Sequence, residues 1–320
     1  MSDAVPVHNQ TQEDPMISMG IKRGVRGTAM SALLAAALTS LVVLGFASQA
    51  FATKPTGDFV NFGNCPTKTA GVNFCVFGQT TSGEFKIKNT EVPITKTITI
   101  QGGIIDNEEA ETETWVNAAN GAETLSKTPQ NVPGGILKLV APSFFPEPLK
   151  KIWEEFIAKS ALGASATAEL EGKITISRLS LLTGAPDALS LPVRVHLENG
   201  FLGSKCYVGS ASKPVVIELT TGETKPPLPN KAIKGSLGEP EFKDEGSLLI
   251  LRKNELVNNT FSAPGAEGCG SQILFGLFTG LIDEAVNAEI GLPSESGNNT
   301  AIFKGTLENA KASAVIASEK

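Results

Sequence analysis

Histidine is nearly missing from this sequence: only two of its 320 residues are His, and His196 is the only one beyond the first 52. Any imidazole chemistry in residues 53–320 would therefore depend on this one side chain. Apolar and polar residues alternate over residues 193–198, and His196 shares the polar set with Arg194 and Glu198. We expect this set on the solvent face of a strand, and no G-x-S-x-G motif accompanies it. The sequence therefore nominates no catalytic residue.

Basic runs and closely spaced cysteine pairs are missing as well. The formal net charge is −6, and no stretch of the chain is rich in Lys or Arg. Binding to a nucleic-acid backbone needs clustered basic residues, so we expect no nucleic-acid partner. No C-x-x-C spacing occurs, which argues against a zinc site. The glycines at 268–270 lack the preceding strand of a dinucleotide-binding motif, so we expect neither a metal nor a cofactor.

The first part of the chain contains the clearest signal. A charge-free apolar stretch covers residues 29–51, follows three basic residues at 22–26 and closes on the small-x-small sequence AFA. This arrangement predicts a secretory signal peptide over residues 1–52, cleaved after Ala52. About 20 apolar residues can also cross a bilayer, so an uncleaved membrane anchor is the alternative. In both cases we expect residues 53–320 to be extracytoplasmic, either secreted or in the cell envelope.

Four cysteines follow this leader: Cys65, Cys75, Cys206 and Cys269. An even number in an oxidising compartment predicts two disulfides, for which three pairings are possible. Cys65 and Cys75 flank a short loop rich in Gly, Pro and Thr, so a local bridge between two paired strands is easy to form. That leaves Cys206 for Cys269, and this bridge would close a loop of about 60 residues, worth about 4 kcal/mol.

Short apolar or alternating runs, separated by Gly- and Pro-rich turns, follow one another along the rest of the chain. This pattern is typical of strands. So many short strands predict a mainly β fold, an antiparallel β-sandwich or a barrel-like domain. The runs that we assign to strands are Val72–Phe77, Glu84–Lys88, Ile94–Ile100, Ile136–Val140, Ala168–Ile176, Val193–Leu197, Val215–Leu219, Ser247–Leu251 and Ala301–Leu307.

Two segments repeat apolar residues at helical spacing instead, at about 147–160 and 271–290. In the first, an apolar face that includes Leu149 and Ile152 predicts an amphipathic surface helix packed on a sheet. The second begins at Ser271, a plausible N-cap, and its apolar face predicts packing in the core, with lipid contact as the alternative.

A Pro-rich connector at 220–231 marks the one candidate domain boundary, because it suits neither a helix nor a central strand. We expect residues 53–320 to form one domain, or two coupled halves that meet at this connector. The predicted bridge between Cys206 and Cys269 would cross it.

One stretch is crowded with carboxylates: Asp106, Glu108, Glu109, Glu111 and Glu113. Carboxylate oxygens are the ligands that Ca²⁺ prefers, but the spacing of an EF-hand is missing. We therefore expect a solvated loop here.

Four blocks of sequence centre on Cys, Gly and Pro: Asn73–Gly78, Gly203–Ser210, Ala263–Gly270 and Gly291–Ser294. Together they resemble a group of exported actinobacterial proteins that have no assigned function. The resemblance covers most of the chain after the leader. It implies secretion and disulfides, and it supplies no catalytic residue.

A leader, disulfides and strands without any catalytic motif predict a non-enzymatic protein of the envelope or the extracellular space. We expect it to bind or structure something at the cell surface, and an apolar groove under a helix would engage an envelope lipid or glycan. One alternative is a secreted hydrolase whose carboxylates converge only in the fold. Another is a membrane-tethered surface domain, if the leader is retained.

Overall fold

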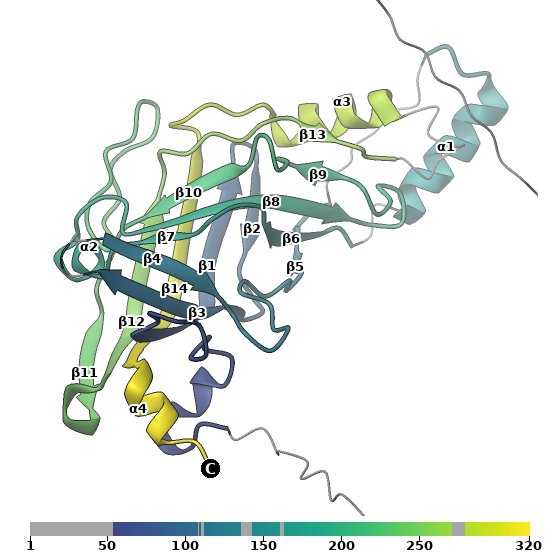
Figure 1. The fold of residues 1–320 in the computed structure, drawn as a ribbon. Coiled ribbons are helices and arrows are strands. Elements are labelled where there is room, and N and C mark those ends of the chain that lie inside the picture. Colours follow the sequence, from purple (N-terminus) through teal and green to yellow (C-terminus); the bar gives the residue numbers. More distant parts are fainter. Residues whose placement is uncertain (1–53, 108, 110–111, 136–142, 161–162, 271–278) are drawn as a thin grey trace, which may run out of the picture. The chain divides into compact units, whose positions relative to one another are not determined.

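The fold is mainly β, as predicted, and consists of two open antiparallel sheets of seven strands each, arranged like a sandwich (Figure 1). The structure is a computed structural model. The predicted leader, the run Ile136–Val140 and the start of the second predicted helix lie outside the described residues. The structure describes residues 54–320 apart from 108, 110–111, 136–142, 161–162 and 271–278.

The first sheet has the strand order β11-β12-β14-β1-β3-β4, and β2 pairs with β1. The runs predicted at 72–77 and 84–88 belong to a single strand, β1. A register shift against β14 between Thr80 and Ser82 interrupts the alternation there, so the sequence shows two runs where the backbone has one strand. The strands of this sheet are β1 (Phe74–Ile87), β2 (Thr90–Pro93), β3 (Ile98–Asn107), β4 (Thr112–Asn117), β11 (Glu239–Lys243), β12 (Leu248–Asn258) and β14 (Asn299–Lys311).

The second sheet has the order β13-β9-β8-β6-β5, and both β7 and β10 also pair with β8. The predicted run Val215–Leu219 coincides with β10. The strands of this sheet are β5 (Gln130–Asn131), β6 (Ser165–Leu170), β7 (Thr175–Ile176), β8 (Leu189–Glu198), β9 (Tyr207–Val208), β10 (Val215–Leu219) and β13 (Ala266–Glu267).

The strand predicted from Ile94 begins only at Ile98. The backbone N–H groups of Thr95 and Lys96 both donate to the side-chain Oε1 of Gln130, at 2.9 and 3.0 Å. Because their donors are engaged by a side chain, these residues do not join the ladder between β1 and β3.

Short helices accompany the sheets, and the two predicted ones behave differently. In the C-terminal one, Ile282, Val286 and Ile290 are buried, in agreement with the prediction of core packing. In the other, Leu149 and Ile152 are 48% and 62% exposed, so the predicted packing of its apolar face on a sheet is wrong at these positions. The helices are α1 (Glu147–Ser160), α2 (Arg178–Thr183), α3 (Thr279–Ile290) and α4 (Ala312–Ala317), with 3₁₀ turns η1 (Gly57–Phe62) and η2 (Asp244–Gly246).

The Pro-rich connector at 220–231 is where the chain passes from the second sheet to the first. It leaves β10, and the backbone of Thr220 then pairs with Val257 of β12 at 3.0 and 2.9 Å. All the described residues fall in one compact unit. The connector therefore links two sheets that share a core.

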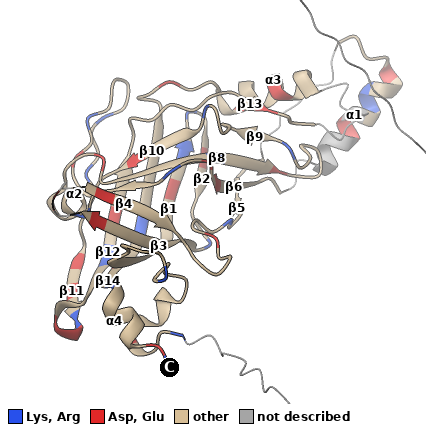
Figure 2. Ribbon diagram, viewed as in Figure 1, with Lys and Arg blue, Asp and Glu red and all other residues tan. Residues whose placement is uncertain are grey.

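The edge strand β11 is protected by charge. Figure 2 shows acidic and basic residues mixed on it. Arg252 and Lys253 of β12 bind Glu241 and Glu239 of β11, each at 2.7 Å. Charged side chains on an exposed edge discourage pairing with a second chain, and Pro240 removes one backbone donor from it.

Two carboxylates lie close together on the β1–β2 hairpin. Glu84 pairs with Pro93 and Glu91 with Lys86, so the two Glu side chains are diagonal neighbours on one face. Burial raises the pKa of the Glu84 carboxyl above its ordinary value, and the charge of Glu91 and a hydrogen bond to it add to the rise. The folded state therefore binds this proton more tightly than the unfolded chain does.

The stability contributed by this proton is complete below the unfolded pKa of Glu84 and is lost as pH rises through the higher folded pKa. We expect Glu84→Gln to raise the free energy of unfolding at pH 7 by about 0.2–1 kcal/mol, the size usual for one cross-strand side-chain pair, because it removes the repulsion between two carboxylates. Near pH 3 the substitution should have no effect. Urea unfolding at both pH values measures this, with Glu218→Gln on β10 as control. Equal effects of Glu84→Gln at the two pH values would contradict the prediction.

Candidate functional site

Among the described residues, four apolar cavities lie in a row between the two sheets. Cavity 1 has a volume of about 110 Å³. Helix α2 lines it on one side, and β1, β12 and β14 line it on the opposite side. Cavities 2, 3 and 4 measure about 70, 60 and 30 Å³ and follow along the sheets toward α3, whose Ile290 lines cavity 4. The interior is therefore not filled to the density usual for a protein core, in which voids larger than a water molecule are few.

Cavities 2, 3 and 4 adjoin one another, because neighbouring ones are lined in part by the same side chains. Cavities 3 and 4 share Phe85, Val92, Ala166 and Val195. Cavities 2 and 3 share five side chains from both sheets: Ile98, Ala168, Val193, Ile217 and Phe303.

A side chain of cavity 1 and a side chain of cavity 2 meet over a glycine. Leu307 lines cavity 1 and Ile100 lines cavity 2. A Cβ atom on Gly78 would lie 2.8 Å from Ile100 Cγ2 and 3.1 Å from Leu307 Cδ1, so both side chains occupy the room that the glycine leaves.

The size of the row decides what it can hold. A dry apolar cavity of about 150 Å³ in another protein binds benzene. Cavity 1 alone would therefore accept a short alkyl segment, and only the row as a whole would accept a longer chain. A narrow, extended space lined by aliphatic and aromatic side chains fits an unbranched hydrocarbon chain better than a compact ring.

The cavity walls contain few polar atoms, and the side-chain amide in the wall of cavity 3, that of Gln130, already makes hydrogen bonds. Gln130 accepts from Thr95 and Lys96 and donates to the Lys96 carbonyl at 2.8 Å. Cavity 1 differs, because Arg178 and Asn309 contribute to its otherwise apolar wall.

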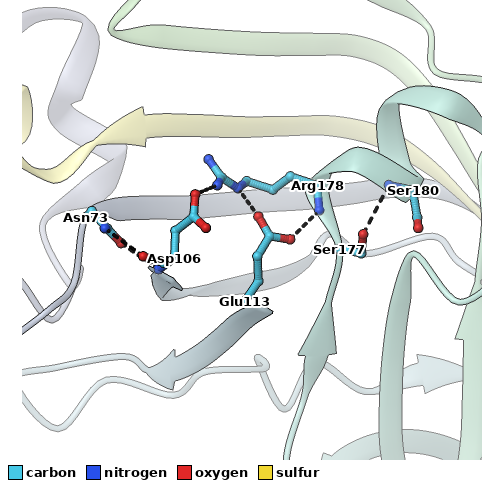
Figure 3. A network of polar contacts seen from close by, with 6 residues as sticks. All are labelled: Asn73, Asp106, Glu113, Ser177, Arg178 and Ser180. Atoms are coloured by element: carbon cyan, nitrogen blue, oxygen red, sulfur yellow. Dashed lines mark hydrogen bonds and ion pairs between the residues drawn. The ribbon is translucent and has the colours of Figure 1, made fainter. Parts of the chain in front are cut away.

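A network of ion pairs closes one side of cavity 1 (Figure 3). Arg178, the first residue of α2, binds Glu113 through Nε and Asp106 through Nη2, and its backbone N–H donates to Glu113 at 2.6 Å. Its guanidinium also lies over the ring of Phe74, 3.7 Å from the centroid. Helix α2 itself is capped by Ser177, which accepts from the Ser180 N–H. This network ties the helix of one sheet to the inner face of the other.

The prediction of a solvated loop for the acidic stretch is wrong for two of its members. Asp106 on β3 and Glu113 on β4 are paired directly opposite each other, with side chains 19% and 14% exposed. Their burial is tolerated because Arg178 neutralises them, and this residue is 65 positions or more away in the sequence. Glu108 and Glu111 lie outside the described residues.

The prediction for His196 is also wrong in part. The residue does face away from the apolar set of β8, but it is only 8% exposed. Tyr207, its partner on β9, stacks on the imidazole with ring centroids 4.4 Å apart, and the Arg194 guanidinium lies 4.2 Å from the same phenol ring. Burial raises the pKa of the Tyr207 phenol, and the charge of Glu169 raises it further. The aromatic neighbour that covers His196 stands 11 residues away in sequence, so alternation alone could not reveal it.

Two of the carboxylate pairs that the fold brings together are engaged by arginine, whereas Glu84 and Glu91 are hydrogen-bonded to each other. Asp106 and Glu113 share Arg178, as described above, while Glu169 and Glu171 share Arg194 at 2.6 and 2.7 Å. The hydrolase alternative remains a prediction, because no contact found here distinguishes an acid–base pair from an ion-pair network.

The structure contains both predicted disulfides. Cys65 binds Cys75 and Cys206 binds Cys269, and all four residues are buried. The second bridge fastens the loop after β8 to the segment that leads into α3, where the Cys269 N–H also donates to Asp283 at 2.7 Å. Two disulfides fit a protein that matures in an oxidising compartment.

Comparisons of the chain with protein-family models, with curated proteins and with solved structures find no match. Within the described ranges, no group of three or more His, Cys, Asp or Glu side chains is placed to hold a metal ion. Nor does any helix among those residues have the length and hydropathy needed to cross a membrane. The row of apolar cavities and the polar network beside cavity 1 are the features that point to a function.

Proposed function

We propose that this chain is a non-enzymatic, extracytoplasmic binding protein that encloses an acyl chain of an envelope lipid between its two sheets. The row of four apolar cavities carries the proposal. Empty apolar volume lowers the stability of a folded protein, by about 24 cal/mol per Å³ in one well-studied series. A binding function supplies a reason for a chain to keep such space, because a bound hydrocarbon regains the lost contacts.

The location follows from the leader and the cysteines. The predicted signal peptide over residues 1–52 would export the chain, and both disulfides fit an oxidising environment. The resemblance to exported actinobacterial proteins points in the same direction. In this proposal the protein is secreted or held in the envelope, where lipids with long acyl chains are its partners.

The proposal is tested by filling the row at one point. Ala168 lines both cavity 2 and cavity 3, and Ala168→Leu would place three more carbon atoms between them. We expect the wild-type protein, stripped of lipid, to bind the neutral, linear polyene probe methyl parinarate with increased fluorescence. In Ala168→Leu the dissociation constant should rise at least tenfold, because the added carbon atoms would occupy space in the two cavities that Ala168 lines. Probe titration at constant protein concentration gives both values.

The matched control is Ala211→Leu, the same substitution on an exposed turn, which should leave probe binding unchanged. Thermal unfolding without the probe should show Ala168→Leu at least as stable as wild type, since filling a cavity commonly stabilises a protein. Wild-type protein that fails to bind the probe, or Ala168→Leu that binds it as well as wild type does, would refute the proposal.

A further inference from the structure

Asn309 is the one side-chain amide in the wall of cavity 1. It lies on β14, where it pairs with Val76 of β1 on one side and with Leu249 of β12 on the other. Residues directly opposite one another in an antiparallel sheet point to the same face. Val76 and Leu249 both line cavity 1, so Asn309 also faces it, from the middle of an apolar floor.

The amide nitrogen of Asn309 is buried and has no hydrogen-bond partner among the described residues. A buried donor without a partner costs roughly 1–3 kcal/mol, and native proteins seldom keep one without a reason. An acceptor atom on a ligand would satisfy this donor.

The charge beside cavity 1 limits what that acceptor can be. The Arg178 guanidinium is bound by two carboxylates, Asp106 and Glu113, so the three side chains together have one excess negative charge. An anionic group placed in this partly buried space would be repelled, because charges interact more strongly away from water. The acceptor that fits here is uncharged.

We infer that the ligand presents a neutral hydrogen-bond acceptor, such as an ester carbonyl, to the Asn309 amide while its alkyl part occupies the row. The ligand is thus an esterified lipid chain and not a free fatty acid. This inference rests on the proposed function, because it assigns the polar part of the same ligand. Asn309 acts in it as a specificity-determining residue.

The test compares three ligands of equal chain length, decane, methyl decanoate and decanoate, as competitors of methyl parinarate. At pH 7 the wild-type protein should bind the methyl ester more tightly than decanoate. In Asn309→Leu, the ratio of the decane dissociation constant to that of the ester should fall about tenfold, the size of one hydrogen bond to a buried donor. Binding of decane itself should persist.

Thr80→Val, which removes a polar atom from cavity 2, is the control and should keep the ester preference. If Asn309→Leu does not fold, Asn309→Ala provides the same comparison with a smaller side chain. This inference would be overturned if the ratio of the decane and ester dissociation constants were equal in wild type and variant, or if decanoate bound more tightly than its ester. Binding of decane would in that case still support the proposed function. Failure of all three ligands to bind would overturn both.

Discussion

Replacing Cys206 and Cys269 together by alanine is expected to lower the free energy of unfolding by about 4 kcal/mol. The two residues are 63 positions apart, and a bridge over that distance removes a large loop entropy from the unfolded chain. Both cysteines are fully buried, so the loss of packing at their sulfur atoms would add to the effect. Guanidinium chloride unfolding of the exported, oxidised protein measures the difference.

The matched variant is the double replacement of Cys65 and Cys75 by alanine. This pair is separated by 10 residues only, and the same entropic argument gives about 3 kcal/mol. The order of the two losses is therefore the informative result. If removal of the short bridge cost as much as or more than removal of the long one, the entropy of the unfolded chain would not be the main origin of the stabilisation.

Arg178→Met is expected to destabilise the protein by about 3 kcal/mol, at the low end of the range for breaking a buried ion pair. The substitution would leave Asp106 and Glu113 partly buried, adjacent and without their cation. The low end applies because both carboxylates keep some contact with water. The backbone N–H of residue 178 would still donate to Glu113, and methionine would still cover Phe74. Chemical unfolding at pH 7 measures the loss.

Removing the two negative charges as well distinguishes the effect of charge on stability from the effect of packing. In the triple variant Arg178→Met, Asp106→Asn and Glu113→Gln, no uncompensated charge remains, and we expect most of the lost stability to return. Replacement of a whole buried ion pair by neutral groups is often tolerated. A triple variant as unstable as Arg178→Met alone would show that compensation of the two negative charges is not the origin of the stabilisation.

Local pattern was a good guide to the strands, because a half-buried strand must alternate or cluster its apolar residues. Val215–Leu219 coincides with β10, and Val193–Leu197 lies within β8. The local pattern was a poor guide where a side-chain hydrogen bond or a β-bulge interrupts the pairing of strands. The bulge between Thr80 and Ser82 divided one strand into two runs, and Gln130 held Thr95 out of its ladder.

The local pattern also predicted some features of the helices and missed others. The spacing of apolar residues in α3 predicted the buried face that the structure shows. The same signal in α1 identified the helix but not its surroundings, since Leu149 and Ile152 remain exposed. Helix α2 was missed because six residues span too few turns for a period to appear, although Ser177 and Gly184 at its ends are typical caps.

The β fold and the two disulfides were determined by the sequence itself, since each depends on residues that act through composition, period or local spacing. Only the tertiary structure decided the environment of the polar groups and the space between the sheets. Arg178 binds Asp106 and Glu113, and Tyr207 covers His196, because the fold places side by side segments that lie apart in the sequence. A cavity has no sequence pattern of its own, because it is the volume that many side chains from both sheets together fail to fill.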